Sequence, residues 1–438
     1  MNIAIIWWWA AGLMAVATLL EEMEIAKEKQ AYHGVINILL FDKNPGLWAK
    51  VIISWGGRCN LTTSITSIKE LKTKYIRGAD FLDDSLKSFT PRSIYKRFEQ
   101  HDIPLKIEDD GRVFPVSNNG KDVVKIFEEL CYHHKVDLHL REWVESISQK
   151  SCSDGRCDGF LISTTKAIYS ADILVITTWW TAFSHTWSSG DGYSFARGLW
   201  HSITPLGPSL NSFLTSETRP HRLSGTVFED GWFRILKSDT QQQNTLVKWP
   251  ILCTHFGISG PGTFALSAEI SYETVSKDEA FKLYLIPDAR KNFERWNELL
   301  VWREKWRGPL VVNKLATIFT RKTAECFVDL ISLDPSTHLQ DFSSADRKKL
   351  CHLLSDGIEL HLIQRRPGDE FVTAGWVNTD EVNPKTMESK IVPWLYFAGE
   401  VLNIDGLTGG FNLTSSRATG RKAGLAIIKK LTTLWSRN

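Results

Sequence analysis

The sequence predicts an α/β fold whose main domain is built around a buried, largely parallel sheet. An apolar run over 2–6 is followed by a helical pattern over 10–30 and by a second apolar run over 35–41. Two later apolar runs, 171–176 and 395–398, have the length and composition of strands that are buried on both faces. The strand, helix and strand at the N-terminus are typical of a parallel pair, because such a pair needs a crossover helix.

The overall composition excludes several other classes of protein. With 52 Lys+Arg against 50 Asp+Glu and 43% hydrophobic residues, the chain is neither disordered nor collagen-like. A net charge of +2 gives no electrostatic footprint for nucleic acid, and we expect no such partner. Seven cysteines without a C-x-x-C pair favour a reducing, cytoplasmic location.

The turn after the first strand departs from the dinucleotide-binding pattern. A Rossmann-like turn reads G-x-G-x-x-G, whereas this chain has Trp7, Trp9 and Gly12 at the three positions. An indole would fill the space in which backbone N–H groups approach a pyrophosphate. Asp42 ends the second strand and follows Gly12 at more than the usual separation of about 20 residues. Two roles are open for Asp42 at this point, a ribose acceptor and a structural strand-end aspartate.

Residues 1–20 allow a second interpretation of the N-terminus. They carry no charged side chain before Glu21, and about 20 apolar residues can span a bilayer. A membrane-anchored protein is therefore an alternative. No positively charged segment flanks this stretch, and the strand–helix pattern accounts for the same residues, so we expect no membrane contact.

Five segments, in order along the chain, resemble the HI0933-like flavoproteins, which include aminoacetone oxidase-like and NAD(P)/FAD-dependent oxidoreductases. The segments are ISWGGRCNL at 53–61, EDDGRVFPVS at 108–117, VITTWWTAFSHTWSSGDGY at 175–193, THFGISGP at 254–261 and LYFAGEVLNIDGLTGGFNLTSSRATG at 395–420. The resemblance implies a discontinuous, Rossmann-like FAD-binding domain over 1–202 and 371–438. An inserted, β-rich and helical substrate-side region would occupy 203–370.

The resemblance also implies a function. We expect an FAD-dependent oxidoreductase that transfers hydride or electrons between its flavin and a small substrate, with NAD(P)H as an electron donor. The residues expected to contact FAD are Trp7, Trp9, Ala10, Ala11, Gly12, Asp42, Lys43, Gly56, Gly57, Arg58, Cys59, Asn60, Thr178, Trp179, Gly399, Glu400, Asp405, Gly409, Gly410, Phe411 and Asn412. We interpret Cys59 as a small buried side chain rather than a redox thiol. The substrate and the oligomeric state do not follow from the sequence.

Other polar groups give weaker indications. His185 and His255 are candidate acid–base groups, although a lone histidine is more often structural. We expect no metal site: Cys152 and Cys157 are too isolated for zinc, and the His133–His134 pair is expected on an exposed helix.

Tryptophan stands at positions where the family has glycine. The clearest positions are Trp7, Trp8, Trp9, Trp55, Trp179 and Trp180, and the same is expected for Trp48, Trp187, Trp200, Trp249, Trp376 and Trp394. Because the polar residues of the same motifs are unchanged, our hypothesis is a gene whose UGA codons mean glycine but were read as tryptophan. Deliberate Gly→Trp engineering is the rival explanation. If the tryptophans are genuine, we expect a flavin-free, non-catalytic scaffold.

Overall fold

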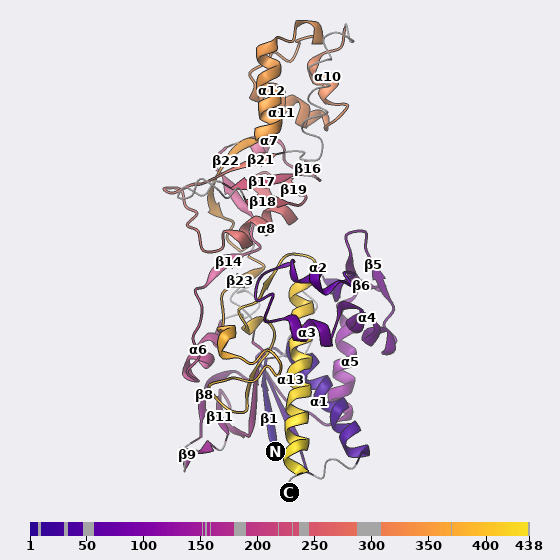
Figure 1. Ribbon diagram of the computed structural model, residues 1–438, viewed down its shortest axis with the longest axis vertical. Coiled ribbons are helices and arrows are strands. Elements are labelled where there is room, and N and C mark those ends of the chain that lie inside the picture. Colours follow the sequence, from indigo (N-terminus) through magenta and orange to yellow (C-terminus); the bar gives the residue numbers. More distant parts are fainter. Residues whose placement is uncertain are drawn as a thin grey trace. The chain divides into compact units, whose positions relative to one another are not determined.

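The computed structural model describes residues 1–7, 10–29, 34–46, 57–150, 152–153, 156–157, 159–178, 190–217, 219–229, 231–235, 245–286, 308–368 and 370–436. Of the expected site residues, Trp9, Gly56, Trp179 and His185 lie outside these ranges. The chain divides into two compact units (Figure 1). Unit 1 combines 1–207 with 372–438, and unit 2 comprises 208–371.

A five-stranded parallel sheet forms the centre of unit 1, and the four expected apolar runs supply four of its strands. Its order is β24-β13-β1-β2-β7, so the chain order reverses between β1 and β13. This is the strand order of a Rossmann domain. The strands are β1 (Asn2–Ile6), β2 (Asn37–Asp42), β7 (Asp137–Leu140), β13 (Ile173–Ile176) and β24 (Leu395–Phe397).

Two long helices pack against each other in unit 1, and Figure 1 shows them running side by side. They are α1 (Ala10–Glu28) and α13 (Phe411–Trp435). Small residues permit the close approach, because a Cβ atom at Gly420 would lie 2.2 Å from the carbonyl oxygen of Ala11. One at Gly424 would lie 3.0 Å from the carbonyl oxygen of Ala15. The packing aligns the two helices that bear the expected cofactor residues.

The smaller elements of unit 1 surround this core. They are α2 (Ile68–Lys72), α3 (Asp83–Ser88), α4 (Pro91–Gln100), α5 (Gly120–His133) and α6 (Asp191–Gly198), with β3 (Thr62–Thr63), β4 (Tyr75–Arg77), β5 (Leu105–Ile107), β6 (Arg112–Pro115), β8 (Val144–Gln149), β9 (Cys152–Ser153), β10 (Arg156–Cys157), β11 (Phe160–Thr164), β12 (Ile168–Ala171), β23 (Val372–Ala374) and β25 (Asp405–Gly406). Strand β4 pairs with β25, which joins the first half of the chain to the segment before α13.

Residues 2–6 form the central strand of the sheet instead of part of a spanning helix. Among the helices that the structure describes, none combines the length and the apolar character needed to cross a bilayer.

Unit 2 contains an antiparallel sheet and a group of helices. The sheet has the order β16-β19-β20-β15-β22-β21-β17-β18. Its strands are β15 (Phe213–Thr215), β16 (Val227–Phe228), β17 (Trp232–Ile235), β18 (Thr245–Lys248), β19 (Ile251–Cys253), β20 (Gly257–Ser259), β21 (Phe281–Ile286) and β22 (Ile358–Arg365). The helices are α7 (Arg219–Arg222), α8 (Pro261–Glu269), α10 (Val311–Leu315), α11 (Arg321–Leu330) and α12 (Ser344–Asp356). The short strand β14 (Gly207–Ser209) lies at the boundary of the units.

Candidate cofactor site

The carboxyl ends of β1 and β13 lie side by side where the strand order reverses. Ile6 pairs with Ile176, and the backbone N–H and hydroxyl of Thr177 both lie 3.1 Å from the carbonyl oxygen of Ile6. Ligands of open α/β sheets bind outside the carboxyl ends of strands at such a reversal. This edge of the sheet is therefore the candidate cofactor site.

The helix that follows β1 directs its N-terminus at this edge. Ala10, Ala11 and Gly12 form its first turn and are buried. Unpaired N–H groups at a helix N-terminus favour a negatively charged ligand such as a phosphate. Trp7 precedes this helix with φ 62°, a left-handed conformation that is a strong outlier for a bulky residue. The backbone of the turn has thus the form that glycine adopts, while the side chain is an indole that is only 5% exposed.

A buried lysine meets this indole at the end of β2. The Lys43 side chain is 2% exposed, and its Nζ atom lies 3.9 Å from the centre of the Trp7 ring and 3.5 Å from Asp191 Oδ2. Burial lowers the pKa of Lys43, although Asp191 opposes the shift. Asp42 is also buried, and its Oδ1 accepts hydrogen bonds from the Asn44 backbone N at 2.7 Å and from Asn44 Nδ2 at 2.8 Å. Asp42 and Lys43 therefore both lie at the expected edge.

The N-terminus of α13 forms the second part of the site. Gly410 caps the helix with φ 88°, and a Cβ atom there would lie 2.8 Å from Asn60 Nδ2. Asn60 is fully buried, and neither its Nδ2 nor its Oδ1 has a hydrogen-bond partner among the described residues. Burying an amide without hydrogen-bond partners costs free energy, and hydrogen bonds to a polar ligand at this point would offset that cost.

The loop before α13 is held by side chains from both halves of unit 1. Asp405 Oδ2 lies 2.6 Å from Arg77 Nη1 on β4, and this carboxylate is 1% exposed. Asn412 donates from Nδ2 to the Gly406 carbonyl at 2.9 Å and accepts from the Gly406 N–H at 2.8 Å. The Tyr75 hydroxyl donates to the Phe411 carbonyl at 2.8 Å, and burial raises the pKa of Tyr75. Asp405 and Asn412 thus shape the loop in this structure.

Three further expected residues, Gly399, Glu400 and Thr178, are buried in unit 1. Gly399 has φ 81°, its N–H donates to Thr419 Oγ1 at 2.9 Å, and a Cβ atom would approach Ala11 Cβ to 2.5 Å. Thr178 is buried, and its hydroxyl has no hydrogen-bond partner among the described residues. Gly399 and the adjacent buried Glu400 therefore lie directly beside the first turn of α1.

Comparison with known proteins identifies the family. A sequence model described as the HI0933-like protein Rossmann domain matches residues 1–426. The chain belongs to the HI0933-like family. It is accordingly a flavin-dependent oxidoreductase by family, built on a Rossmann domain.

Relatives of this HI0933-like chain extend over most of its length. It is 25% identical over 415 residues to a 3-dehydro-bile acid delta(4,6)-reductase from Clostridium scindens, which covers 91% of this chain and 94% of the relative. It is 25% identical over 381 residues to a ribosomal RNA dihydrouridine synthase from Escherichia coli, covering 86% and 88%. Among solved structures, quinol fumarate reductase from E. coli is similar with a TM-score of 0.49 and 14% identity, covering 99% of this chain and 70% of that one.

Three described tryptophans of the HI0933-like chain adopt a left-handed backbone: Trp7 (φ 62°), Trp200 (φ 62°) and Trp394 (φ 66°). All three are among the positions where glycine was expected from the family. Trp376 differs, since it is not among the residues with positive φ. Its indole is 1% exposed and donates to the Thr373 carbonyl at 3.1 Å. The backbone thus favours glycine at three of these positions and is indifferent to it at Trp376.

Three other residues singled out in the sequence are described by the structure. The Arg58 guanidinium pairs with Glu108 and donates from Nε to Asn118 Oδ1 at 3.0 Å. Gly57 has a positive φ of 95°, a backbone conformation that favours glycine. His255 is exposed and belongs to unit 2. Among the described residues, the Arg58 guanidinium also lies 4.0 Å from the centre of the Phe114 ring.

Sequence reasoning missed one buried cation near the site. Arg417 lies on α13 and is 4% exposed, with Leu413 O at 3.3 Å and Leu61 O as acceptors. Burial lowers the pKa of Arg417, and a hydrogen bond with Cys59 opposes the shift. Its position in the specific C-terminal motif was visible in the sequence, but its burial depends on how α13 packs.

Proposed function

We propose that the natural protein is an FAD-dependent oxidoreductase whose cofactor lies along the carboxyl edge of the unit 1 sheet. The observation that carries the proposal is Asn60, a fully buried amide with no partner for either polar atom among the described residues. It lies against Gly410, the N-cap of the long helix α13. An amide offers both a donor and an acceptor, which suits the polar edge of a flavin ring.

The remaining site residues would hold the other parts of FAD. In this proposal the first turn of α1 faces the pyrophosphate, and Asp42 accepts from ribose hydroxyls. Gly399, Glu400 and Thr178 would contact the part of FAD between its pyrophosphate and its flavin ring. The bound flavin supplies the hydride or electron chemistry. The N-terminus of α13 favours negative charge beside it, because its N–H groups carry the positive end of the helix dipole.

The residues at the dinucleotide turn do not fit the cofactor as the sequence is written. The Trp7 indole stands against Lys43 in the turn that family members keep free with glycine. This observation favours a second candidate function for the printed sequence, a flavin-free scaffold without catalysis. The two candidates concern the same fold and differ only in the residues at the turn.

We further propose that the enzyme reduces a small organic substrate and that NAD(P)H supplies the electrons. The names of both relatives describe reduction, one as a delta(4,6)-reductase and one as a dihydrouridine synthase. Unit 2 corresponds in sequence to the expected inserted region and would bind the substrate. The proposal assigns no substrate, because the two relatives act on substrates of very different size according to their names.

The test compares two versions of the full chain. One has the printed sequence, and the other has glycine at positions 7, 8, 9, 55, 179 and 180. We expect the glycine version to purify with flavin absorbance and to release FAD on denaturation, and the printed version to be colourless. A yellow printed version would contradict the proposal that the tryptophans block the site. A glycine version that folds but binds no added FAD would contradict the FAD site itself.

Asn60→Leu in the glycine version tests the central residue. We expect its FAD affinity to fall by about tenfold, which corresponds to about 1.4 kcal/mol. The matched control is Asn211→Leu, because Asn211 is similarly buried in unit 2 and its Oδ1 also lacks a partner among the described residues. Equal losses in both variants would mean that a buried asparagine matters only for stability.

The codons of the source gene distinguish the two candidate functions without any variant. UGA at positions 7–9, 55 and 179–180, with glycine in native peptides by mass spectrometry, would support the enzyme. UGG codons would establish the tryptophans as genuine and would favour the flavin-free scaffold.

A further inference from the structure

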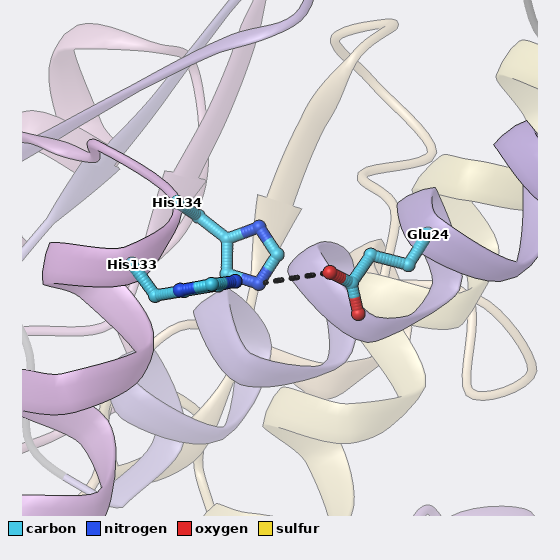
Figure 2. A group of neighbouring side chains, drawn as sticks. All are labelled: Glu24, His133 and His134. Carbon is cyan, nitrogen blue, oxygen red and sulfur yellow. Dashed lines mark ion pairs between the residues drawn. The ribbon is translucent and has the colours of Figure 1, made fainter.

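Two helix ends of unit 1 bring three metal-binding side chains together. Glu24 lies near the end of α1, and His133 and His134 lie at the end of α5 (Figure 2). One ligand atom from each residue lies within 4.8 Å of the other two. We call these three residues the Glu24 cluster. It is the only such group among the described residues.

The two histidines of the cluster are consecutive residues at the end of α5. In a regular helix, neighbouring side chains diverge by about 100°, because there are about 3.6 residues per turn. His134 is instead the C-cap, with φ −90° and ψ 5°, and Lys135 follows in the left-handed region with φ 54°. The two imidazole rings lie with their centres 5.1 Å apart and are nearly perpendicular, at 82°. The two rings therefore lie close together at the end of α5, although they belong to consecutive residues.

Glu24 completes the cluster from the neighbouring helix. Its Oε1 lies 3.4 Å from His134 Nε2, and Figure 2 shows the carboxylate turned toward the His134 ring. Glu24 and His133 are exposed, while the His134 side chain is 17% exposed. Solvent therefore reaches the cluster, and one of its ligands is held in place by the surrounding protein.

We propose that the Glu24 cluster binds a borderline divalent cation such as Zn²⁺. Two imidazoles and one carboxylate are a known donor set for zinc, which takes His nitrogen and carboxylate oxygen at about 2.0–2.2 Å. Mg²⁺ and Ca²⁺ prefer sites made of oxygen ligands, so they fit this cluster poorly. Three protein ligands leave a position for water. The ion ties the C-terminal ends of α1 and α5 together.

Zinc binding to the full-length, untagged chain tests this proposal. A competition titration against a chromophoric zinc chelator should give one Zn²⁺ per chain. His133→Gln and Glu24→Gln should each weaken the binding by at least about tenfold, since even the loss of a residue that only hydrogen-bonds to a metal ligand costs about 10–100-fold in affinity. Mg²⁺ should not compete. His133→Gln is the more informative variant, because it leaves the His134–Glu24 ion pair intact.

A two-ligand pair elsewhere provides the control. His352 Nδ1 lies 2.8 Å from Asp356 Oδ2 on an exposed face of α12, without a third ligand among the described residues. His352→Gln should leave zinc affinity unchanged. Zn²⁺ should also raise the thermal unfolding midpoint of the unchanged chain and of His352→Gln, but not of His133→Gln. The proposal is overturned if the chain binds no zinc, or if zinc binds equally well after His133→Gln.

Discussion

The Nζ atom of Lys43 lies 3.9 Å from the centre of the Trp7 indole, at the turn where β1 leads into α1. A cation over the face of a tryptophan is a favourable contact, and here both groups are buried. The contact stands at the position where a Rossmann domain brings its glycine backbone close to a pyrophosphate. With glycine at position 7, the same ammonium would face the cofactor.

Lys43→Met in the glycine version tests this role of Lys43. We expect FAD affinity to fall by about tenfold, or about 1.4 kcal/mol, because a buried cation beside a phosphate would be lost. Isothermal titration of the apoprotein with FAD measures the change. Lys429→Met, which removes an exposed cation of α13, should leave the affinity unchanged. An unaltered FAD affinity in Lys43→Met would show that Lys43 does not contribute to cofactor binding.

Trp200→Gly separates backbone strain from side-chain burial. Trp200 has φ 62° and is 64% exposed, so its ring contributes little packing. We expect Trp200→Gly to be about 1 kcal/mol more stable than Trp200→Ala, because only glycine adopts this conformation without strain. Denaturant unfolding of both variants measures the difference. An alanine variant as stable as the glycine variant would show that position 200 does not need glycine.

Gly420→Ala tests the contact between the two long helices. A Cβ atom would lie 2.2 Å from the carbonyl oxygen of Ala11, so we expect a loss of about 1–3 kcal/mol in the free energy of unfolding. Gly198→Ala is the control, because there the nearest described atom is the Ile147 oxygen at 3.8 Å. Gly198 lies at the end of α6, where alanine should be neutral or slightly stabilising. Equal stability of both variants would contradict the close packing.

Glu217→Gln tests a pH-dependent contact within unit 2. Burial alone would raise the pKa of Glu217, but hydrogen bonds from the backbone and side chain of His361 lower it, with Nδ1 at 2.6 Å from Oε1. A carboxyl with a lowered folded pKa adds stability above its unfolded pKa of about 4.3, and this stability is lost as the pH falls through the folded value.

We therefore expect Glu217→Gln to lower stability by about 1 kcal/mol at neutral pH and to have a smaller effect in acid. Thermal unfolding midpoints at neutral pH and near pH 4 measure this trend. Glu325→Gln is the control, since its partner Arg321 is an exposed neighbour on the same helix. A loss that grows in acid would have the wrong sign for this pair.

The expected helix at 10–30 corresponds to α1 (Ala10–Glu28). The parallel strands were predictable because strands buried on both faces read as continuous apolar runs. The pairing of Arg77 with Asp405 was not predictable, since it joins side chains that are far apart in the sequence. The same holds for Arg58, which pairs with Glu108.

The sequence by itself determined the class of fold, the order of its motifs and the positions where tryptophan stands in place of a glycine expected from the family resemblance. These properties depend on local composition, spacing and the order of residues along the chain. Only the tertiary structure decided that Asn60 is buried against Gly410 and that Lys43 covers Trp7. Such contacts depend on the packing of α13 and of neighbouring strands, which brings distant residues within a few ångströms and removes them from water.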